Sequence, residues 1–233
     1  MIVEDIREYF KRQLSHNLFT VDKTGAKTIE MMGATFLADE PSIFGTPVQS
    51  YIDAELAWYE SRSTNINDIH GSDKSPPAAW EYAADKHGNI NSNYGHLVFD
   101  EKYHNQFAKA FSELVSNPDS RRAQMVYNRP SIWVEYDEGG KSDFICTNAQ
   151  TFYIRKNELH MVSQMRSNDV VFGYKNDYAW AQYLMDKFVK HWNNHVALTF
   201  DRAEGTIQPI KKGTLTWQVM NLHVYERHFE LVK

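Results

Sequence analysis

The densest group of reactive side chains in this chain lies between residues 146 and 180. It consists of a lone cysteine, Cys146, and of two later runs, Gln164-Met165-Arg166-Ser167-Asn168-Asp169 and Gly173-Tyr174-Lys175-Asn176-Asp177-Tyr178-Ala179-Trp180. A thiol, a guanidinium, a hydroxyl and two carboxylates with a glycine between them are groups that a nucleotide site uses. The residue types alone leave a second interpretation open, in which Arg166 and Asp169 form an ion pair and Cys146 is a small buried apolar residue.

The overall composition favours a globular protein that acts on small molecules. Of the 233 residues, 42% are hydrophobic and 14% are aromatic, which is enough for a sizeable core and argues against disorder. The formal net charge is −5, whereas a protein that binds a nucleic-acid backbone usually carries a basic excess. We therefore expect free small molecules as partners and no direct contact with nucleic acid.

The N-terminal residues and the number of cysteines indicate the cellular compartment. No apolar run approaches the length that spans a bilayer, and the run Met1-Ile2-Val3-Glu4-Asp5-Ile6-Arg7 lacks the apolar region of a signal peptide. A single cysteine forbids an intrachain disulfide and fits a reducing compartment. The sequence therefore predicts a cytoplasmic protein without membrane association.

Hydrophobic periodicity predicts a mixture of helices and strands. Apolar residues three or four apart indicate helices over Val3–Leu14, Tyr51–Glu60, Phe107–Leu114 and Tyr178–Trp192. Extended segments are expected over Thr28–Leu37 and Gly213–Val232, and two strands joined by a tight turn over Asn148–Arg166. Ser72–Pro77 reads as a surface loop. In the absence of an internal repeat, this mixture predicts a single α+β domain over residues 1–233.

Metal and phosphate-loop motifs give little signal. His191 and His195 stand four apart on a predicted helix, a spacing that can bind zinc, but no Cys-rich or Glu-rich partner motif accompanies them. A solvated surface explains the pair better, so no metal is expected. The sequence contains no P-loop and no GxGxxG fingerprint.

Several short motifs occur along the chain in the same order as in one known protein family. The string Arg166-Ser167-x-Asp169-Val170-x-x-Gly173, twenty residues after a cysteine, resembles the thymidylate synthase superfamily. So do four further elements, Glu55-Leu56-x-Trp58, Tyr94-Gly95, Asn117-Pro118-Asp119-Ser120-Arg121-Arg122 and His223-x-Tyr225. Together they cover the chain from about Asp22 to Val232. The resemblance is greatest to the bacteriophage deoxycytidylate (dCMP) hydroxymethylase branch, which shares the strings Asn91-Ser92-Asn93-Tyr94-Gly95 and Ser167-Asn168-Asp169-Val170-Val171-Phe172-Gly173.

The resemblance implies a fold, two substrates and a covalent mechanism. The family fold is a mixed, mostly antiparallel sheet flanked by helices, and two subunits form a homodimer through the sheet. The substrates would be a pyrimidine nucleotide and 5,10-methylenetetrahydrofolate. Position 5 of a pyrimidine is a poor nucleophile, and addition of a thiolate at C6 activates it. Cys146 would be that thiolate, and Arg166 would help to hold it ionised.

Further residues receive roles from the same resemblance. The nucleotide would be bound by Arg166, Ser167, Asn168, Asp169, His223 and Tyr225, together with Arg121 and Arg122 of the partner subunit. Of these, the arginines would bind phosphate, and His223 and Tyr225 the sugar hydroxyl. Lys23 stands where the synthases commonly carry an arginine and would neutralise phosphate without bidentate geometry. Glu55 would organise water and proton transfer, and Tyr94 would assist removal of the C5 proton. The folate would contact Glu55, Trp80, Asp169 and Gly173.

Asp177 bears on which pyrimidine is the substrate. Synthases that act on dUMP carry asparagine at this position, where an amide matches the O4 and N3–H edge of uracil. Cytosine reverses that edge, and a carboxylate accepts from its N4 amino group and favours a proton at N3. The neighbouring Asn176 would exchange places with Asp177 if the register slipped, but Gly173 and Tyr178 anchor the match. The sequence therefore favours cytosine.

The fate of the one-carbon unit separates the remaining alternatives. A hydroxymethylase adds water and releases tetrahydrofolate, whereas a synthase transfers hydride and leaves a methyl group. Thr147 replaces the histidine that commonly follows the synthase cysteine, and Met165 replaces a common glutamine. We expect dCMP hydroxymethylation. The alternatives are a dCMP 5-methyltransferase, a dUMP-specific thymidylate synthase and an inactive nucleotide-binding subunit.

Overall fold

One six-stranded sheet organises the molecule. The computed structural model describes residues 1–21, 25–71, 73–199 and 207–233. The sheet order is β1-β2-β6-β5-β4-β3, with strand bounds Thr20–Val21, Lys27–Leu37, Lys211–Tyr225, Glu158–Asp169, Thr147–Arg155 and Gln124–Val126. Only β5 and β6 pair in parallel, and the other neighbours are antiparallel. The expected mixed, mostly antiparallel α+β sheet is confirmed.

The hairpin of β4 and β5 follows from its turn residues. Lys156 and Asn157 both have positive φ, 51° and 59°, which gives the two-residue turn the backbone twist that flanking strands require. Thr147 pairs with Met165 across the hairpin, so the cysteine just before β4 lies opposite Arg166. The backbone N–H of Arg166 donates to the Cys146 carbonyl at 2.9 Å. Register alone therefore places the thiol beside the guanidinium.

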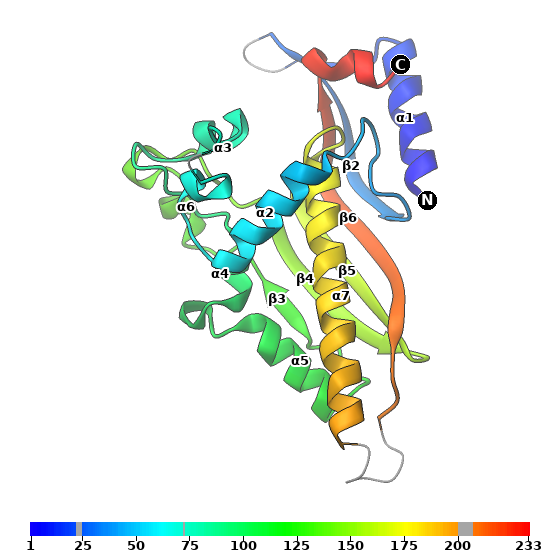
Figure 1. Ribbon diagram of the computed structural model, residues 1–233. Helices are drawn as coiled ribbons and strands as arrows, with labels where there is room; N and C mark the ends of the chain where they lie inside the picture. Colours follow the sequence, from blue (N-terminus) through cyan, green and yellow to red (C-terminus); the bar gives the residue numbers. More distant parts are fainter. Residues whose placement is uncertain (22–24, 72, 200–206) are drawn as a thin grey trace.

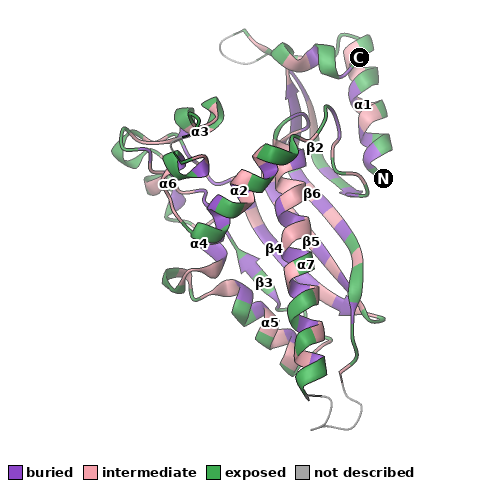
Figure 2. Ribbon diagram, viewed as in Figure 1, coloured by how far each residue is buried: buried purple, intermediate pink, exposed green. Residues whose placement is uncertain are grey.

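Helix α7, Gly173–Thr199, lies along one face of the sheet (Figure 1). Trp180, Leu184, Phe188 and Trp192 recur every four residues and are all buried, so the predicted helical stripe is confirmed. The helix begins five residues before the predicted start. Along β5, buried Leu159, Met161, Ser163 and Met165 alternate with partly exposed residues, an alternation visible in Figure 2. One sheet face is thus covered by α7 and the other is more open.

Other predicted elements also appear with small shifts. Helices α1, α2 and α5 span Val3–Ser15, Gln49–Ser61 and Gln106–Ser116, and the predicted loop is confirmed over its described residues 73–77. Three short helices were not predicted, α3 (Ala78–Ala83), α4 (Tyr94–Phe99) and α6 (Ile132–Glu135), nor was β3. The remaining turns are 3₁₀ helices at Ile66–Ile69, Glu101–Tyr103 and Glu138–Gly140.

The prediction that Gly213–Val232 is extended throughout is wrong at its end. The strand β6 stops at Tyr225, and Glu226–Leu231 forms a 3₁₀ helix, η4. Phe229 and Val232 are both buried and three residues apart, and a 3₁₀ helix places such residues on one side. Phe229 stacks on Phe19 with a centroid distance of 5.3 Å.

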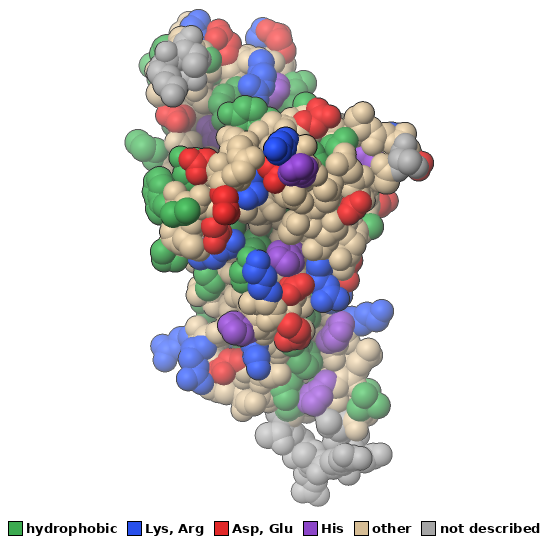
Figure 3. All heavy atoms as spheres, turned by 90° about the vertical axis from the view of Figure 1, so that its left-hand side faces the viewer, with side chains coloured by type: hydrophobic (Ala, Val, Ile, Leu, Met, Phe, Trp, Pro, Cys, Tyr) green, Lys and Arg blue, Asp and Glu red, His purple; other side chains and the backbone are tan. Residues whose placement is uncertain are grey.

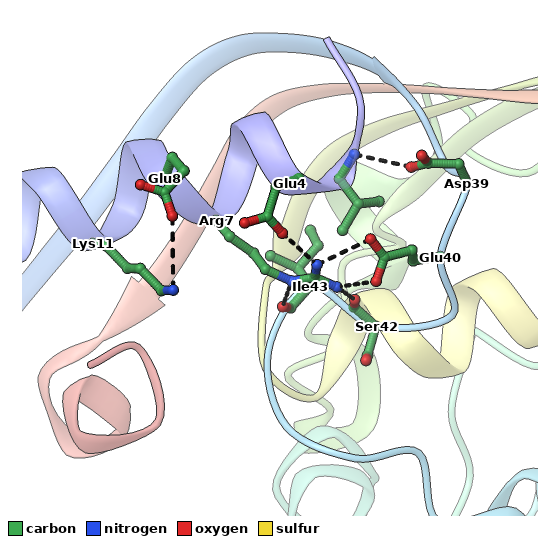
Figure 4. A network of polar contacts seen from close by, with 9 residues as sticks. Glu4, Arg7, Glu8, Lys11, Asp39, Glu40, Ser42 and Ile43 are labelled. Atoms are coloured by element: carbon green, nitrogen blue, oxygen red, sulfur yellow. Dashed lines mark hydrogen bonds and ion pairs between the residues drawn. The ribbon is translucent and has the colours of Figure 1, made fainter.

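Arg7 of α1 fixes the connection between β2 and α2 (Figure 4). Its Nε donates to the Ile43 carbonyl at 2.7 Å and one Nη donates to the Ser42 carbonyl at 2.8 Å. The guanidinium also bonds the carboxylates of Glu4 and Glu40. This clamp orders the segment that leads into α2, the helix that carries Glu55.

Candidate active site

A cavity of about 460 Å³ opens where β5 and β6 end and α7 begins. Parallel strands bring their carboxyl ends to the same edge of a sheet, and β5 pairs Asp169 with His223 there. Helix α2 adds Glu55, α4 adds Tyr94 and the start of β4 adds Cys146. The cavity lining contains twelve of the residues given roles in the sequence, namely Glu55, Trp80, Tyr94, Cys146, Arg166, Ser167, Asn168, Asp169, Gly173, Asp177, His223 and Tyr225.

Two sequence-predicted residues that the structure describes, Arg121 and Arg122, are not in this cavity. Arg121 and Arg122 are exposed on the loop before β3, and Arg122 forms an ion pair with Glu113 at 2.9 Å. Lys23 lies outside the described residues. Among the described residues that line the cavity, Arg166 is the one lysine or arginine.

Cys146 is half-buried, and its thiol faces Arg166. One guanidinium nitrogen lies 3.5 Å from Sγ, while Nε donates to the Ile145 carbonyl at 3.0 Å. Burial raises the pKa of the thiol. The Arg166 charge lowers this pKa, and the charges of Asp177 and Asp143 raise it, so that the pKa of the thiol is about 11. The arginine therefore acts in the expected direction, but burial has the larger effect and the thiol stays protonated at neutral pH.

Glu55 is buried in the cavity wall and is held by two donors. The Tyr51 hydroxyl donates to Oε1 at 2.6 Å, and the Trp80 indole N–H lies 3.2 Å from the same oxygen. Burial raises the pKa of Glu55 to about 7, although both hydrogen bonds lower it. A carboxyl group with this pKa exchanges protons readily at neutral pH.

Asp177 lies one helical turn into α7, and its carboxyl group is bonded by a residue of β5. The Asn168 amide donates to Oδ2 at 2.7 Å. Burial raises the pKa of the Asp177 carboxyl to about 8, and the negative charge of Glu55 raises it further, while hydrogen bonds from Asn168 and Tyr94 lower it. Two carboxyl groups that share one cavity and have raised pKa values are a recurring feature of acid–base sites.

Tyr94 reaches the site from the first turn of α4. Its hydroxyl accepts from the Thr147 hydroxyl at 3.0 Å, which leaves its own proton free to be donated toward Asp177. Gly95 allows α4 to pack closely against α2, because a Cβ atom built at Gly95 would lie 1.7 Å from the Tyr59 carbonyl oxygen. Thr147, noted in the sequence as a departure from the synthases, thus orients Tyr94.

Asp169 has a divided role at the start of α7. Its Oδ1 accepts from the backbone N–H groups of Val171 and Phe172 at 2.9 and 2.6 Å. Its Oδ2 is buried without a hydrogen-bond partner among the described residues. One oxygen therefore caps the turn, and the other remains able to accept from a ligand.

Comparison with known proteins identifies the family. The sequence profile of the family described as thymidylate synthase matches residues 8–233. The chain belongs to the thymidylate synthase family. It is 46% identical, over 232 residues, to the deoxycytidylate 5-hydroxymethyltransferases of Enterobacteria phages T4 and T2, which covers 100% of this chain and 89% of each relative. A thymidylate synthase from Corynebacterium aurimucosum is 24% identical over 100% of this chain and 82% of its own length.

Tyr51 is a residue of the candidate site to which the sequence analysis gave no role. It lines the cavity and contacts both Glu55 and Trp80. The available signal was its position four residues before Glu55 on a predicted helix, since side chains at that spacing meet. Phe172 and Tyr59 also line the cavity without having been assigned a role.

A larger cavity of about 1130 Å³ lies beside the end of α2, at Ser61, and beside His96 of α4, and is lined mostly by polar residues. Its arginine Arg129 is paired with Glu135, and its histidine His96 lies 3.5 Å from Asp100. Charges of both signs are interspersed on the corresponding face of the molecule (Figure 3). Because Cys146, Arg166 and the other residues of the family motifs line the smaller cavity, that cavity is the candidate site for the family's chemistry.

The described part of the chain contains neither a candidate metal site nor a candidate membrane span. No group of three or more His, Cys, Asp or Glu side chains there is arranged to hold a metal ion. None of the helices built from those residues combines the length and apolarity needed to cross a membrane.

Proposed function

We propose that this protein transfers a one-carbon unit from 5,10-methylenetetrahydrofolate to C5 of dCMP and adds water, giving 5-hydroxymethyl-dCMP and tetrahydrofolate. The phage relatives are named for hydroxymethyl transfer to deoxycytidylate. The structural observation that carries the proposal is that the Asp177 carboxyl and the Cys146 thiol line one cavity.

Cys146 acts as the covalent nucleophile in this proposal. Its sulfur bonds to C6 of the cytosine ring, and the C5–C6 double bond supplies the electron pair that attacks the one-carbon unit from C5. The C5 proton then leaves, and the bond between the transferred carbon and the folate nitrogen breaks, which releases tetrahydrofolate and leaves an exocyclic methylene group. Water adds to that methylene carbon, and the S–C6 bond breaks to restore the ring. Because the thiol of the free protein has a pKa of about 11, we expect nucleotide binding and Arg166 to favour its ionisation.

Asp177 recognises the cytosine edge. One carboxyl oxygen accepts from the N4 amino group, and the proton shared between the carboxyl and N3 completes the pair. The pKa of about 8 for Asp177 means that this proton is available near neutral pH. A proton held at N3 also stabilises the negative charge that develops on the ring when the thiolate adds.

Glu55 handles the water. Tyr51 and Trp80 occupy its Oε1, so Oε2 is left to orient a water molecule and to accept its proton. Its pKa of about 7 suits a group that takes up and releases a proton in one cycle. Water addition requires no hydride transfer, so tetrahydrofolate leaves at its original oxidation level.

The folate fits the apolar side of the cavity. Ala79, Trp80, Ala83 and Phe172 line that side, and such surfaces bury a flat heterocycle. Asp169 Oδ2, buried and unpartnered among the described residues, is an acceptor for a ring N–H. When bound, 5,10-methylenetetrahydrofolate supplies the methylene group. Gly173 at the cavity edge keeps this side open.

The phosphate site is the reason to propose a homodimer. A phosphomonoester carries nearly two negative charges at neutral pH, and Arg166 is the one cation among the described residues lining the cavity. Arg121 and Arg122 of a partner subunit would add two more, and Ser167 and His223 would add hydrogen bonds. The sheet face opposite α7 carries Val162, Gln164, Thr216 and Gln218 in adjacent registered positions, which provides the surface for the subunit contact. A reducing cytoplasm would keep Cys146 as a thiol.

The test is the mass of the product. Protein, 5,10-methylenetetrahydrofolate and either dCMP or dUMP are incubated side by side, and the nucleotides are analysed by mass spectrometry. We expect 5-hydroxymethyl-dCMP from dCMP and little product from dUMP. A methyl product lighter by one oxygen would indicate a methyltransferase, and product from dUMP alone would indicate a synthase. The Cys146→Ser variant should lose turnover entirely, and unchanged turnover in that variant would refute covalent catalysis.

A further inference from the structure

Asn168 connects Asp177 to the buried core. Its Nδ2 donates to Asp177 Oδ2 at 2.7 Å, and its Oδ1 accepts from the Trp217 indole N–H at 3.2 Å. The three residues come from β5, α7 and β6. Asn168 is 4% exposed and Trp217 is fully buried, so this chain of hydrogen bonds is shielded from competing water.

The direction of each hydrogen bond in this chain is fixed by chemistry. An indole N–H can only donate, so the Asn168 atom that faces Trp217 must be its oxygen. The amide nitrogen of Asn168 therefore faces Asp177, and the carboxyl oxygen nearest to it must accept. Trp217 thus determines, through one intermediate residue, that Oδ2 of Asp177 is an acceptor and that any proton on this carboxyl resides on Oδ1.

Gly173 confines the Asn168 amide from the other side. A Cβ atom at Gly173 would lie 3.0 Å from Asn168 Nδ2 and 3.8 Å from Asp177 Oδ2, a closer approach to the amide than packed atoms normally make. The absence of a side chain at this position leaves space for the amide and little more. The sequence resemblance placed Gly173 near the folate, and the structure adds this second role.

We propose that Asn168, oriented by Trp217, is a positioning residue that sets which hydrogen-bonding face of residue 177 meets the pyrimidine. This inference rests on the proposed function, in which residue 177 meets the ring. Oδ2 of Asp177 is held by Asn168, and Oδ1 faces the N3 and C4 edge of the ring, where it accepts from the exocyclic group once its proton has passed to N3. Cytosine has an amino donor at C4 and is accepted, whereas uracil presents an acceptor there and is rejected.

The proposal makes a specific statement about amides at position 177. In Asp177→Asn, the Asn168 N–H requires the new amide to turn its oxygen inward, so its NH₂ group faces the ring and favours uracil. Adding Asn168→Asp reverses this orientation. The carboxylate at position 168 accepts from the NH₂ group of residue 177 and from Trp217, so the amide oxygen of residue 177 turns to the ring and again favours cytosine.

The experiment compares kcat/KM for dCMP and dUMP in the wild-type protein, in Asp177→Asn and in the double variant Asn168→Asp/Asp177→Asn. The double variant keeps a hydrogen bond between the two positions and the bond from Trp217. We expect Asp177→Asn to shift the dCMP/dUMP ratio toward dUMP by about tenfold or more, and the double variant to recover about tenfold toward dCMP. A double variant with the same ratio as Asp177→Asn would overturn the role of Asn168. A wild-type protein that does not prefer dCMP would instead overturn the proposed function.

A second measurement covers the case in which the double variant does not fold. In Asn168→Ala, Asp177 loses a hydrogen bond that favours its ionised form, so the pH midpoint of dCMP affinity, measured calorimetrically without folate, should rise. The matched control is Asn89→Ala, because Asn89 donates to Asp85 at 3.2 Å in a similar pair away from the cavity. An Asn168→Ala midpoint that stays with the wild-type and control values would contradict the proposal.

Discussion

The Tyr51 hydroxyl lies 2.6 Å from Glu55 Oε1, one helical turn earlier on α2. Trp80 donates both to this hydroxyl, at 3.0 Å, and to the same carboxylate oxygen. The three side chains therefore form a closed hydrogen-bonded group in which only Oε2 of Glu55 is left for chemistry. This arrangement gives Tyr51 a measurable effect on catalysis without placing it against the substrate.

We predict that Tyr51→Phe lowers kcat/KM for dCMP about tenfold at pH 7, the cost of one hydrogen bond to a charged group. The Tyr51 hydrogen bond lowers the pKa of Glu55, so its loss raises that pKa. The acid limb of the pH–rate profile should therefore move to higher pH, and the activity deficit should shrink as the pH rises. The measurement is kcat/KM from pH 5.5 to 9.

Tyr183→Phe is the matched control for this prediction. Tyr183 donates to Glu60, also on α2, but this pair lies outside the site cavity. Its removal should leave the acid limb in place. An unshifted limb in Tyr51→Phe would show that Tyr51 does not tune Glu55.

Asp177→Asn should make the protein more stable at alkaline pH. The Asp177 pKa rises from 3.8 in the unfolded chain to about 8 in the fold. The folded state thus binds this proton more tightly, and the contribution of Asp177 to stability is lost as pH rises from about 4 through about 8. An amide has no such titration. We expect the variant to gain on the order of 1–3 kcal/mol at pH 8.5 and much less at pH 5, measured by thermal unfolding.

Asp143→Asn provides the contrast. Asp143 is also buried, but it accepts from the backbone N–H and the hydroxyl of Ser92 and from the Asn91 N–H. An amide nitrogen facing these donors leaves them unsatisfied, so this variant should lose stability at both pH values. Equal stability changes for Asp177→Asn at the two pH values would contradict a raised pKa of the Asp177 carboxyl in the folded protein.

The main elements were predictable because their patterns are local. The four-residue spacing from Trp180 to Trp192 specifies α7, and the Lys156-Asn157 turn specifies the hairpin that aligns Cys146 with Arg166. Strand β3 has three residues and α4 has six, too few for a periodic signal. Their formation depends on packing such as the contact of Gly95 with the Tyr59 backbone.

The site was predicted mainly through resemblance, and the structure shows why the residues alone were insufficient. Arg166 and Asp169 were open to interpretation as an ion pair, but Arg166 bonds backbone carbonyls and Asp169 caps the turn that precedes α7. The contact of Asn168 with Asp177 joins the end of β5 to α7, and the contact with Trp217 joins β5 to β6 across 49 positions. No local pattern reports such contacts.

Gly95→Ala should destabilise the fold strongly. A methyl group there would lie 1.7 Å from the Tyr59 carbonyl oxygen, so α4 must move away from α2. The aromatic contact between Tyr59 and Tyr94, with a centroid distance of 5.4 Å, would separate. We expect a loss of about 3 kcal/mol or more in unfolding free energy, the scale of overpacking against backbone. Gly140→Ala is the control, since its Cβ would meet nothing within 4 Å, although its positive φ of 89° adds a small strain. Similar losses in both variants would exclude the Tyr59 contact as the cause.

The Cys146 thiol should be slow to react in the free protein. Burial raises its pKa to about 11, and only the thiolate attacks an alkylating reagent. The rate of iodoacetamide modification should therefore keep rising above pH 9, and mass spectrometry can follow it without ambiguity because the chain has one cysteine. Arg166→Gln removes the charge that lowers this pKa and should slow modification about tenfold at pH 8, the effect of roughly one pKa unit. Asp177→Asn removes a charge that raises it and should accelerate modification at alkaline pH, where Asp177 is ionised. A modification midpoint below pH 8.5 in the wild-type protein would mean that Arg166 outweighs burial, and that the nucleophile is ionised before the nucleotide binds.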